Sequence, residues 1–418
     1  MRSNDLTLAL ALSALLAACG GGGGSPPATA PTASQPTPTP SPTPSPGPTP
    51  TPAPTGSDSN LLALSVDGST CAAGSYLNKP CVSVTVCVPG TATCQSIGDL
   101  LLDTGSTGLR LFSQVLTLSL PAVTAGGQAV AECVSYLDGS SQWGPIAEAD
   151  VVLGGEPPVR VPIQIIDGTY SARPSACANA DPGPSAAGFN GILGVATFEQ
   201  DCGPACTAAA NGIYFTCSGS SCASAALAIS SQVRNPVAAL PVDNNGVAVR
   251  LPAIGAGGAA SVEGALVLGI GTRANNTPLA STQAFPLDGV GEFRTTLAGV
   301  TLPAFADTGS NGLFFPAPSG VGLAACPAPA NGWYCPSTTV TLTADNAGAQ
   351  GPATDAVRFQ IASIQALGAG VVVSAEVGGP LPAGTGFDWG LPFHLGRDVY
   401  VGFEGRRSPL GPGPFVAW

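Results

Sequence analysis

Two aspartates in repeated surroundings are the residues of this chain most able to do chemistry. Residues 102–109 read Leu-Asp-Thr-Gly-Ser-Thr-Gly-Leu, and residues 306–313 read Ala-Asp-Thr-Gly-Ser-Asn-Gly-Leu. From Asp103 and from Asp307 onward, six of seven positions are identical. A single Asp-Thr-Gly is a common turn sequence. Two extended copies 204 residues apart, each after an apolar run, instead predict a duplicated site.

Two carboxyl groups that face one another across such a site can hydrolyse an amide bond. If Asp103 and Asp307 lie within hydrogen-bonding distance, they cannot both ionise easily, so they share one proton and titrate as a pair. The charged member can deprotonate a water molecule while the neutral member polarises a carbonyl group, and no covalent intermediate is needed. The pattern therefore predicts catalytic roles for Asp103 and Asp307.

The other residues of each copy are expected to support the two carboxyl groups. Gly105 and Gly309 allow a backbone approach that a Cβ atom would block. We expect each serine to hydrogen-bond the outer oxygen of its own aspartate, and each threonine to tie the two loops together. The serines are Ser106 and Ser310, and the threonines are Thr104 and Thr308. The alternative interpretation is that both motifs are turns of a β protein without catalysis.

The composition favours a body rich in strands and loops. Charged residues make up 9% of the 418 residues, while glycine (56) and proline (42) are abundant, which disfavours long amphipathic helices. The length suffices for two domains, each with its own core. A net charge of −12, with Lys79 as the only lysine, argues against a nucleic-acid partner, because a phosphate backbone would be repelled.

The first residues are typical of a bacterial export signal. Thirteen largely apolar residues, 6–18, are too few to span a bilayer but suit a signal peptide. Residues 16–19 (Leu-Ala-Ala-Cys) resemble the lipobox of bacterial lipoproteins, which implies a signal peptide over residues 1–18 and lipidation of Cys19. Gly20 implies sorting to the outer membrane, facing the periplasm or the cell surface. A plain cleaved signal peptide is the alternative.

Residues 19–59 are predicted to form the lipidated cysteine and a disordered tether behind it. A glycine run is followed by segments with proline at every second position. Proline fixes φ and removes amide donors, and the segment offers nothing apolar to bury, so we expect a polyproline-II-like spacer. A low-complexity tail without a role is the alternative.

The remaining cysteines indicate an oxidising compartment. With Cys19 reserved for lipid, twelve of thirteen cysteines are left, an even number that favours disulfides in the periplasm or at the cell surface. Three local pairs are predicted, namely Cys87–Cys94, Cys217–Cys222 and Cys326–Cys335. Six cysteines cannot be paired from the sequence: Cys71, Cys81, Cys133, Cys177, Cys202 and Cys206. A zinc site is the alternative for Cys202, Cys206, Cys217 and Cys222, although such a compartment favours disulfides.

Together with the two motifs, several segments resemble the pepsin-like aspartic peptidases. Residues 134–140 are similar to the β-hairpin flap of that family, and they include Tyr136 at the flap tyrosine and Gly139. An ordinary strand aromatic is the alternative for Tyr136. Residues 190–195 are similar to the apolar-apolar-glycine element under the first catalytic loop. Strands of the C-terminal lobe are expected at residues 266–271, 293–300 and 399–403.

One segment departs from that resemblance. Residues 388–390 (Asp-Trp-Gly) stand where the family has two apolar residues before a glycine, so residues 395–396 (Leu-Gly) are an alternative for this element. His394 is expected to be a local hydrogen-bonding residue, because no serine or cysteine motif is present for it to serve. The chain is also similar to a bacterial family of lipoproteins of unknown function, which shares both motifs, the Gly-Leu-Pro-Phe segment and the Gly-Pro-Phe-Val-Ala ending.

These resemblances imply one fold and one function. The expected fold is all-β, a bilobal pepsin-like acid-protease fold with pseudo-twofold related lobes at residues 60–235 and 236–418. The expected function is that of a monomeric aspartic endopeptidase, which cleaves an extended peptide or protein substrate between the lobes without metal or cofactor. Membrane contact is expected through the lipid anchor only.

A non-catalytic envelope lipoprotein that binds a peptide or a polysaccharide in the same cleft is the alternative. An open cleft above converging carboxyl groups would favour the enzyme, whereas a cleft filled by side chains would favour the binding protein.

Overall fold

The structure is a computed structural model and describes residues 58–72, 76–382 and 384–418. The predicted signal peptide, Cys19 and the tether up to residue 57 lie outside the described residues. Among the described residues, no helix combines the length and the apolar character needed to cross a membrane.

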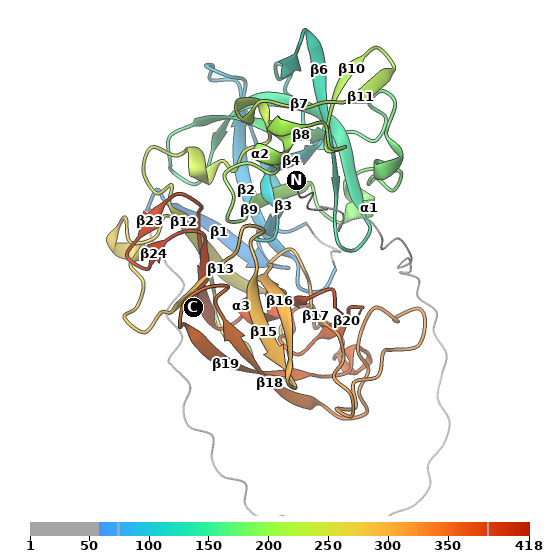
Figure 1. The fold of residues 1–418 in the computed structure, drawn as a ribbon, viewed down its shortest axis with the longest axis vertical. Helices are drawn as coiled ribbons and strands as arrows, with labels where there is room; N and C mark the ends of the chain where they lie inside the picture. Colours follow the sequence, from blue (N-terminus) through green and yellow to red (C-terminus); the bar gives the residue numbers. More distant parts are fainter. Residues whose placement is uncertain (1–57, 73–75, 383) are drawn as a thin grey trace, which may run out of the picture.

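β-Strands dominate the described part of the chain, which is an all-β structure (Figure 1). The three α-helices found there each have four or five residues: α1 (Pro184–Ala187), α2 (Pro204–Ala208) and α3 (Leu391–His394). This agrees with the high glycine and proline content, because both residues are unfavourable inside a helix.

Most strands belong to one sixteen-stranded sheet. In chain order they are β1 (Leu61–Val66), β2 (Pro80–Cys87), β3 (Cys94–Asp103), β4 (Thr107–Phe112), β5 (Thr124–Ala125), β6 (Gln128–Ser135), β7 (Ser141–Val152), β8 (Val159–Ile166), β9 (Gly191–Val195), β10 (Tyr214–Ser218), β11 (Ser221–Ser224), β12 (Gly246–Leu251), β13 (Val262–Leu268), β14 (Ala284–Pro286), β22 (Arg397–Gly402) and β25 (Phe415–Ala417).

A second sheet has seven strands, and two further strands form a small third sheet. The seven are β15 (Phe293–Leu297), β16 (Val300–Ala306), β17 (Leu313–Phe315), β18 (Val340–Ala347), β19 (Thr354–Ile361), β20 (Gly378–Pro380) and β21 (Phe387–Trp389). The small sheet contains β23 (Arg407–Ser408) and β24 (Gly411–Pro412).

The two copies of the Asp-Thr-Gly motif lie in the same strand arrangement. We call residues 58–235 the N-terminal half and residues 236–418 the C-terminal half. Around the first motif the strand order is β2-β3-β9-β4-β8, and around the second it is β15-β16-β21-β17-β20. The parallel and antiparallel pairings also correspond, strand by strand. The repeat in the sequence is therefore a repeat in the structure.

The two halves have separate cores and share three central strands, β1, β12 and β13. An aliphatic core fills the N-terminal half and continues under β12 and β13, whereas aromatic rings such as Phe315, Phe387 and Trp389 stack in the C-terminal half. β1 pairs along its whole length with β13. In Figure 1, β6, β7 and β8 lie above this shared set, and β15, β18 and β19 lie below it. The two motifs thus meet where the halves adjoin.

Candidate active site

The two turns bring Asp103 and Asp307 together from opposite halves. A Cβ atom on Gly105 would lie 2.7 Å from Cγ of Asp307, and one on Gly309 would lie 2.9 Å from Cγ of Asp103. Each glycine therefore lies directly against the carboxyl group of the other motif, where no side chain fits. Burial, and then the nearby carboxyl group of Asp103, raise the pKa of Asp307. This proximity of the two motifs is the juxtaposition that the repeated sequence predicts.

Reciprocal hydrogen bonds between the threonines lock the two turns. The amide of Thr104 donates to Oγ1 of Thr308 at 3.1 Å, and the amide of Thr308 donates to Oγ1 of Thr104 at 3.0 Å. Each hydroxyl then donates across the junction, to the carbonyl oxygens of Ala306 and Leu102 at 2.9 and 2.7 Å. Both threonines are buried. Because these buried bonds cross between the halves, the dyad geometry is fixed by backbone as well as side chains.

Asp103 accepts three hydrogen bonds from its own turn. The amides of Gly105 and Ser106 donate to Oδ1 at 2.7 and 3.1 Å. The hydroxyl of Ser106 donates to Oδ2. Donors of this kind stabilise a carboxylate.

Asp307 accepts fewer bonds and lies in a less favourable place for a charge. The amide of Gly309 donates to Oδ1 at 2.7 Å and the hydroxyl of Ser310 to Oδ2 at 2.8 Å. Burial, and then the neighbouring charge of Asp103, raise the pKa of Asp307 well above its usual range. The two carboxyl groups of the pair therefore have unequal surroundings, with more hydrogen-bond donors around Asp103 than around Asp307.

A cleft of about 1100 Å³ opens above the dyad and is lined by residues of both halves. Tyr136 lines it from the turn between β6 and β7, and its hydroxyl donates to Oε1 of Gln142 at 3.0 Å. Gly139 lies in the same turn with a φ of +84°, a conformation that suits glycine. Leu137 at the tip is 80% exposed. The predicted flap residues Tyr136 and Gly139 thus lie in the turn of the β6–β7 hairpin, and Tyr136 lines the cleft.

A charged network in the cleft wall was missed by sequence reasoning. The guanidinium of Arg110, which is 1% exposed, donates to Glu132 at 2.9 Å and to Asp201 at 3.0 Å. The hydroxyl of Tyr214 donates to Asp201 at 2.5 Å. Burial raises the pKa of Glu132 well above its usual range, although Arg110 opposes this shift. The available signal was Arg110 itself, the one charged residue in the apolar segment 107–112.

The cleft lining is strongly acidic. Among the described residues that line it, Arg110 is the one basic side chain, whereas the acidic side chains are Asp103, Glu132, Asp138, Asp181, Asp201, Glu292 and Asp307. Burial, and then the charge of Asp138, raise the pKa of Asp181 to about 6. At neutral pH the cleft therefore has a negative potential, which attracts cationic groups.

The segment under the second motif is Phe387–Trp389 followed by Gly390, and the alternative at residues 395–396 is wrong. β21 runs parallel to β16, as β9 runs parallel to β3. A Cβ on Gly390 would lie 2.6 Å from the carbonyl oxygen of Ser310, and one on Gly194 would lie 2.7 Å from that of Ser106. The position requires a glycine under the turn, and the polarity of the residues before it does not decide the match.

His394 is fully buried in α3 beside this segment. Its Nδ1 lies 3.4 Å from the carbonyl oxygen of Gly390, and burial lowers the pKa of the ring to about 3. A neutral, buried imidazole that contacts the backbone agrees with the structural role expected for it.

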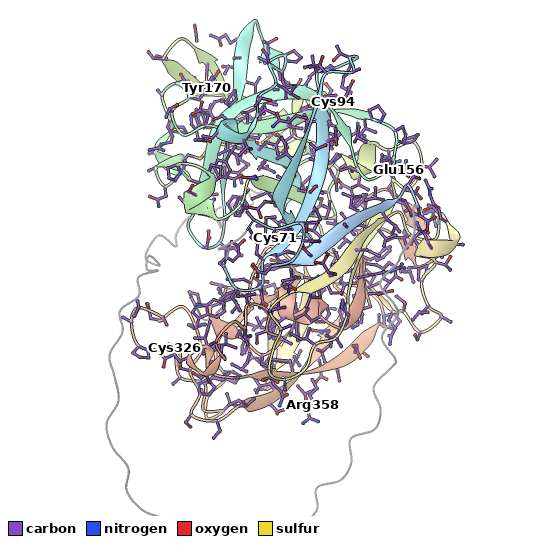
Figure 2. All side chains as sticks on the ribbon, turned by 180° about the vertical axis from the view of Figure 1, so that it is seen from behind. Cys71, Cys94, Glu156, Tyr170, Cys326 and Arg358 are labelled. Carbon is purple, nitrogen blue, oxygen red and sulfur yellow. A yellow bond between two sulfur atoms is a disulfide. The ribbon has the colours of Figure 1, made fainter. Side chains whose placement is uncertain are left out.

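Six disulfides link the described cysteines. The three predicted pairs, Cys87–Cys94, Cys217–Cys222 and Cys326–Cys335, are confirmed. The other pairs are Cys71–Cys81, Cys133–Cys177 and Cys202–Cys206. The zinc alternative for Cys202, Cys206, Cys217 and Cys222 is wrong, because their sulfurs are consumed in two disulfides. Figure 2 shows the bridges spread over the molecule, with Cys94, Cys71 and Cys326 at different levels. Such a framework identifies an extracellular or periplasmic protein.

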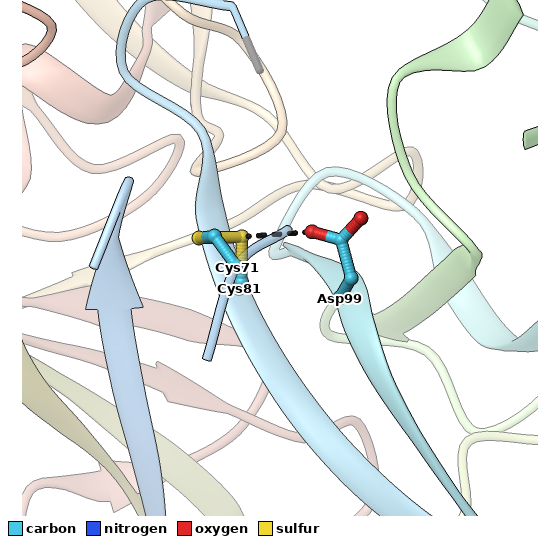
Figure 3. A group of neighbouring side chains, drawn as sticks. All are labelled: Cys71, Cys81 and Asp99. Carbon is cyan, nitrogen blue, oxygen red and sulfur yellow. Dashed lines mark hydrogen bonds between the residues drawn. A yellow bond between two sulfur atoms is a disulfide. The ribbon is translucent and has the colours of Figure 1, made fainter. Parts of the chain in front are cut away.

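One group in the described residues has the spacing of metal ligands, namely Cys71, Cys81 and Asp99 (Figure 3). Its two sulfurs form a disulfide and offer no thiolate. Oδ1 of Asp99 lies 3.5 Å from the sulfur of Cys81 and accepts a hydrogen bond from the buried ammonium group of Lys79 at 2.5 Å. The group is therefore a buried ion pair packed on a disulfide.

Comparison with known proteins places the chain in one family. A search of the curated proteins found no match. The model of a family described as "Protein of unknown function (DUF3443)" matches residues 56–418, which include both motifs, the cleft and all six disulfides. The chain belongs to this family.

Proposed function

We propose that this protein is an aspartic endopeptidase with a bilobal, pepsin-like fold, in which Asp103 and Asp307 activate one water molecule. The observation that carries the proposal is the pairing of these two carboxyl groups across duplicated, interlocked turns. The open cleft above them supports the enzyme over the binding protein, because a substrate backbone has room to reach the pair.

In the proposed mechanism, Asp103 is the base and Asp307 the acid. Asp103, with its three donors, takes a proton from the attacking water, while Asp307 donates its proton to the carbonyl oxygen of the peptide bond. The resulting gem-diol collapses when Asp103 returns a proton to the leaving nitrogen and Asp307 recovers one from a hydroxyl. The carbon–nitrogen bond breaks, and the dyad again holds one proton.

The substrate is proposed to lie extended in the cleft, beneath the β6–β7 hairpin, with its main chain hydrogen-bonded like an added strand. The acidic lining favours a segment that carries lysine or arginine. We expect peptides with basic residues next to the cleaved bond to show a kcat/KM at least about tenfold higher than matched acidic peptides at low salt. Cleavage rates for such peptide pairs, measured at increasing salt concentration, check this. Equal rates for both peptides at low salt would show that the lining does not select charge.

The function itself is tested by incubating the purified protein with an unbiased peptide library across about pH 3 to 7, a range around the carboxyl reference values. We expect cleavage that chelators and serine or cysteine reagents do not inhibit and that a statine-type transition-state mimic does. A folded protein that cleaves nothing at any pH but retains peptides or polysaccharides would favour the non-catalytic binding protein instead.

The proposed location is the outer membrane, with the body held by lipid on Cys19 and the tether of residues 19–59. The disulfides support export, and the lipobox supports the anchor. Replacing Cys19 with serine is expected to leave an unprocessed or soluble form, which fractionation and mass spectrometry of the N-terminus detect. A Cys19→Ser protein that fractionates with membranes as the wild type does would refute the anchor.

A further inference from the structure

A third buried carboxyl group, that of Asp388, lies on β21, between the strands that enter and leave the second motif. Asp388 is 4% exposed and lies opposite Phe305 of β16 and Phe314 of β17. Its strand neighbours Phe387 and Trp389 belong to the aromatic core. Because side chains alternate across a strand, Asp388 points to the opposite face, on which its strand partners Phe305 and Phe314 line the cleft.

The N-terminal half shows that the fold does not need a carboxyl group at this place. In the corresponding register, Ile192 of β9 lies opposite Leu101 of β3 and Arg110 of β4. Ile192 is buried to a similar extent as Asp388. One half therefore fills the position with an apolar side chain and the other with an acid, which points to a role other than packing.

The contacts of Asp388 leave it poorly suited to carry a charge. Burial raises the pKa of Asp388 well above its usual range, and Ser310, whose hydroxyl donates to Asp307 at 2.8 Å, opposes this shift. Its Oδ1 is buried without a hydrogen-bond partner, and none of the ion pairs in the described part of the chain includes it. A buried carboxylate without a cation is costly, so the group keeps its proton.

Asp388 interacts with both acids of the dyad, which lie on neighbouring elements. Asp103 at the end of β3 adds to burial in raising the pKa of Asp388, and the charge of Asp388 in turn raises the pKa of Asp307 after β16. Its strand partners Phe305 and Phe314 carry no charge. The three carboxyl groups are therefore one coupled set, in which the ionisation of one strengthens proton binding by the others.

We propose that Asp388 is a positioning residue of the dyad, a third carboxyl group that holds its own proton in acid and, once ionised, keeps the proton on Asp307. This rests on the proposed peptidase function. The dyad then stays in its singly protonated form to higher pH than two carboxyl groups alone would. Such an extension suits a site that works outside the acidic range typical of isolated carboxyl pairs.

The pH profile of cleavage by the full-length protein tests this proposal. Asp388→Asn removes the charge and keeps the shape, and Asp388→Ile installs the residue of the N-terminal half. With either variant we expect the alkaline half-activity point to fall by about one pH unit, while the maximal rate in acid stays within about threefold of wild type. If the variants instead lose cleavage rate equally at every pH, and the alkaline half-activity point does not move, Asp388 has a structural role and the proposal is overturned.

A second readout does not depend on activity and separates the two hypotheses. Carbon-13 NMR of labelled aspartate carboxyl groups follows each proton directly, and single substitutions assign the signals. We expect Asp388 to stay protonated at a pH where an ordinary aspartate is ionised, and Asp307 to titrate at lower pH in Asp388→Asn than in the wild type. If the wild type cleaves nothing, the peptidase function is wrong, but the expected shift in the titration of Asp307 would still support coupling among the three carboxyl groups. An unchanged Asp307 titration overturns the set itself.

Discussion

Replacing either aspartate of the dyad with asparagine is expected to reduce peptide cleavage by at least about 10³-fold, because neither carboxyl group can act alone. Asp103→Asn removes the base and Asp307→Asn removes the acid. The double variant should be no slower than the single ones, since residues that act as a unit lose activity non-additively. Initial rates on the best library peptide, at the pH optimum of the wild type, measure this.

A matched control keeps this prediction specific to catalysis. Asp288→Asn changes an acid that hydrogen-bonds the amides of Val290 and Glu292 near the cleft and does not touch the dyad. It should cleave at close to the wild-type rate. If Asp103→Asn or Asp307→Asn also cleaves at that rate, while folded, the peptidase function is wrong.

Replacing Arg110 with methionine is expected to lower the free energy of unfolding by about 3–5 kcal/mol at neutral pH, because it leaves buried acids without their cation. Glu132 and Asp201 both contact the guanidinium at about 3 Å, and all three side chains are at least nine-tenths buried. Denaturant titrations followed by tryptophan fluorescence measure the free energy.

The difference in the free energy of unfolding between Arg110→Met and the wild type should become smaller in acid. Burial already raises the pKa of Glu132 in the folded protein, and removing Arg110 raises it further. A carboxyl group with a raised folded pKa contributes stability that is present below the unfolded pKa and lost as the pH rises through the folded pKa. The stability of the Arg110→Met protein should therefore be close to that of the wild type near about pH 4 and should become lower than it as the pH rises to neutral.

Arg160 supplies the control for this second prediction. It pairs with Asp150 at 2.8 Å, but its side chain is 52% exposed. Surface pairs contribute little, so Arg160→Met should unfold at nearly the wild-type denaturant concentration. Should Arg110→Met unfold at the same concentration as Arg160→Met at neutral pH, the buried network would not be required for the fold.

The dyad could be predicted because the motif contains its own constraints. Each motif contains a glycine that contacts the opposite carboxyl group, a serine that donates to its own aspartate and a threonine that bonds the other turn, all within three residues of Asp103 or Asp307. A duplicated local pattern therefore carries nearly all the information about this part of the site. The three local disulfides were predictable for the same reason, since short loops bring their cysteines together.

Contacts between residues that lie on different strands and far apart in the chain could not be predicted. Arg110 meets an acid that is 91 residues away in the chain, and Cys133 pairs with Cys177 over a separation of 44 residues. Asp388 looked like a departure from an apolar pattern, because the sequence does not show which strand face meets the dyad. These contacts depend on sheet register, which one sequence pattern does not determine.

The pairing of β1 with β13 also sets an order for assembly. The side-chain amide of Asn60, just before β1, donates to the carbonyl oxygen of Leu268, 208 residues later. β1 pairs with β2 at only two register positions, whereas it pairs with β13 along its whole length. Most of its backbone pairing therefore forms only when β13 is present. A chain that is exported from its N-terminus must therefore deliver residues up to Leu268 before its first strand can settle. Until then, the open edge of β1 can pair with a chaperone or with the edge of a second, incompletely folded chain.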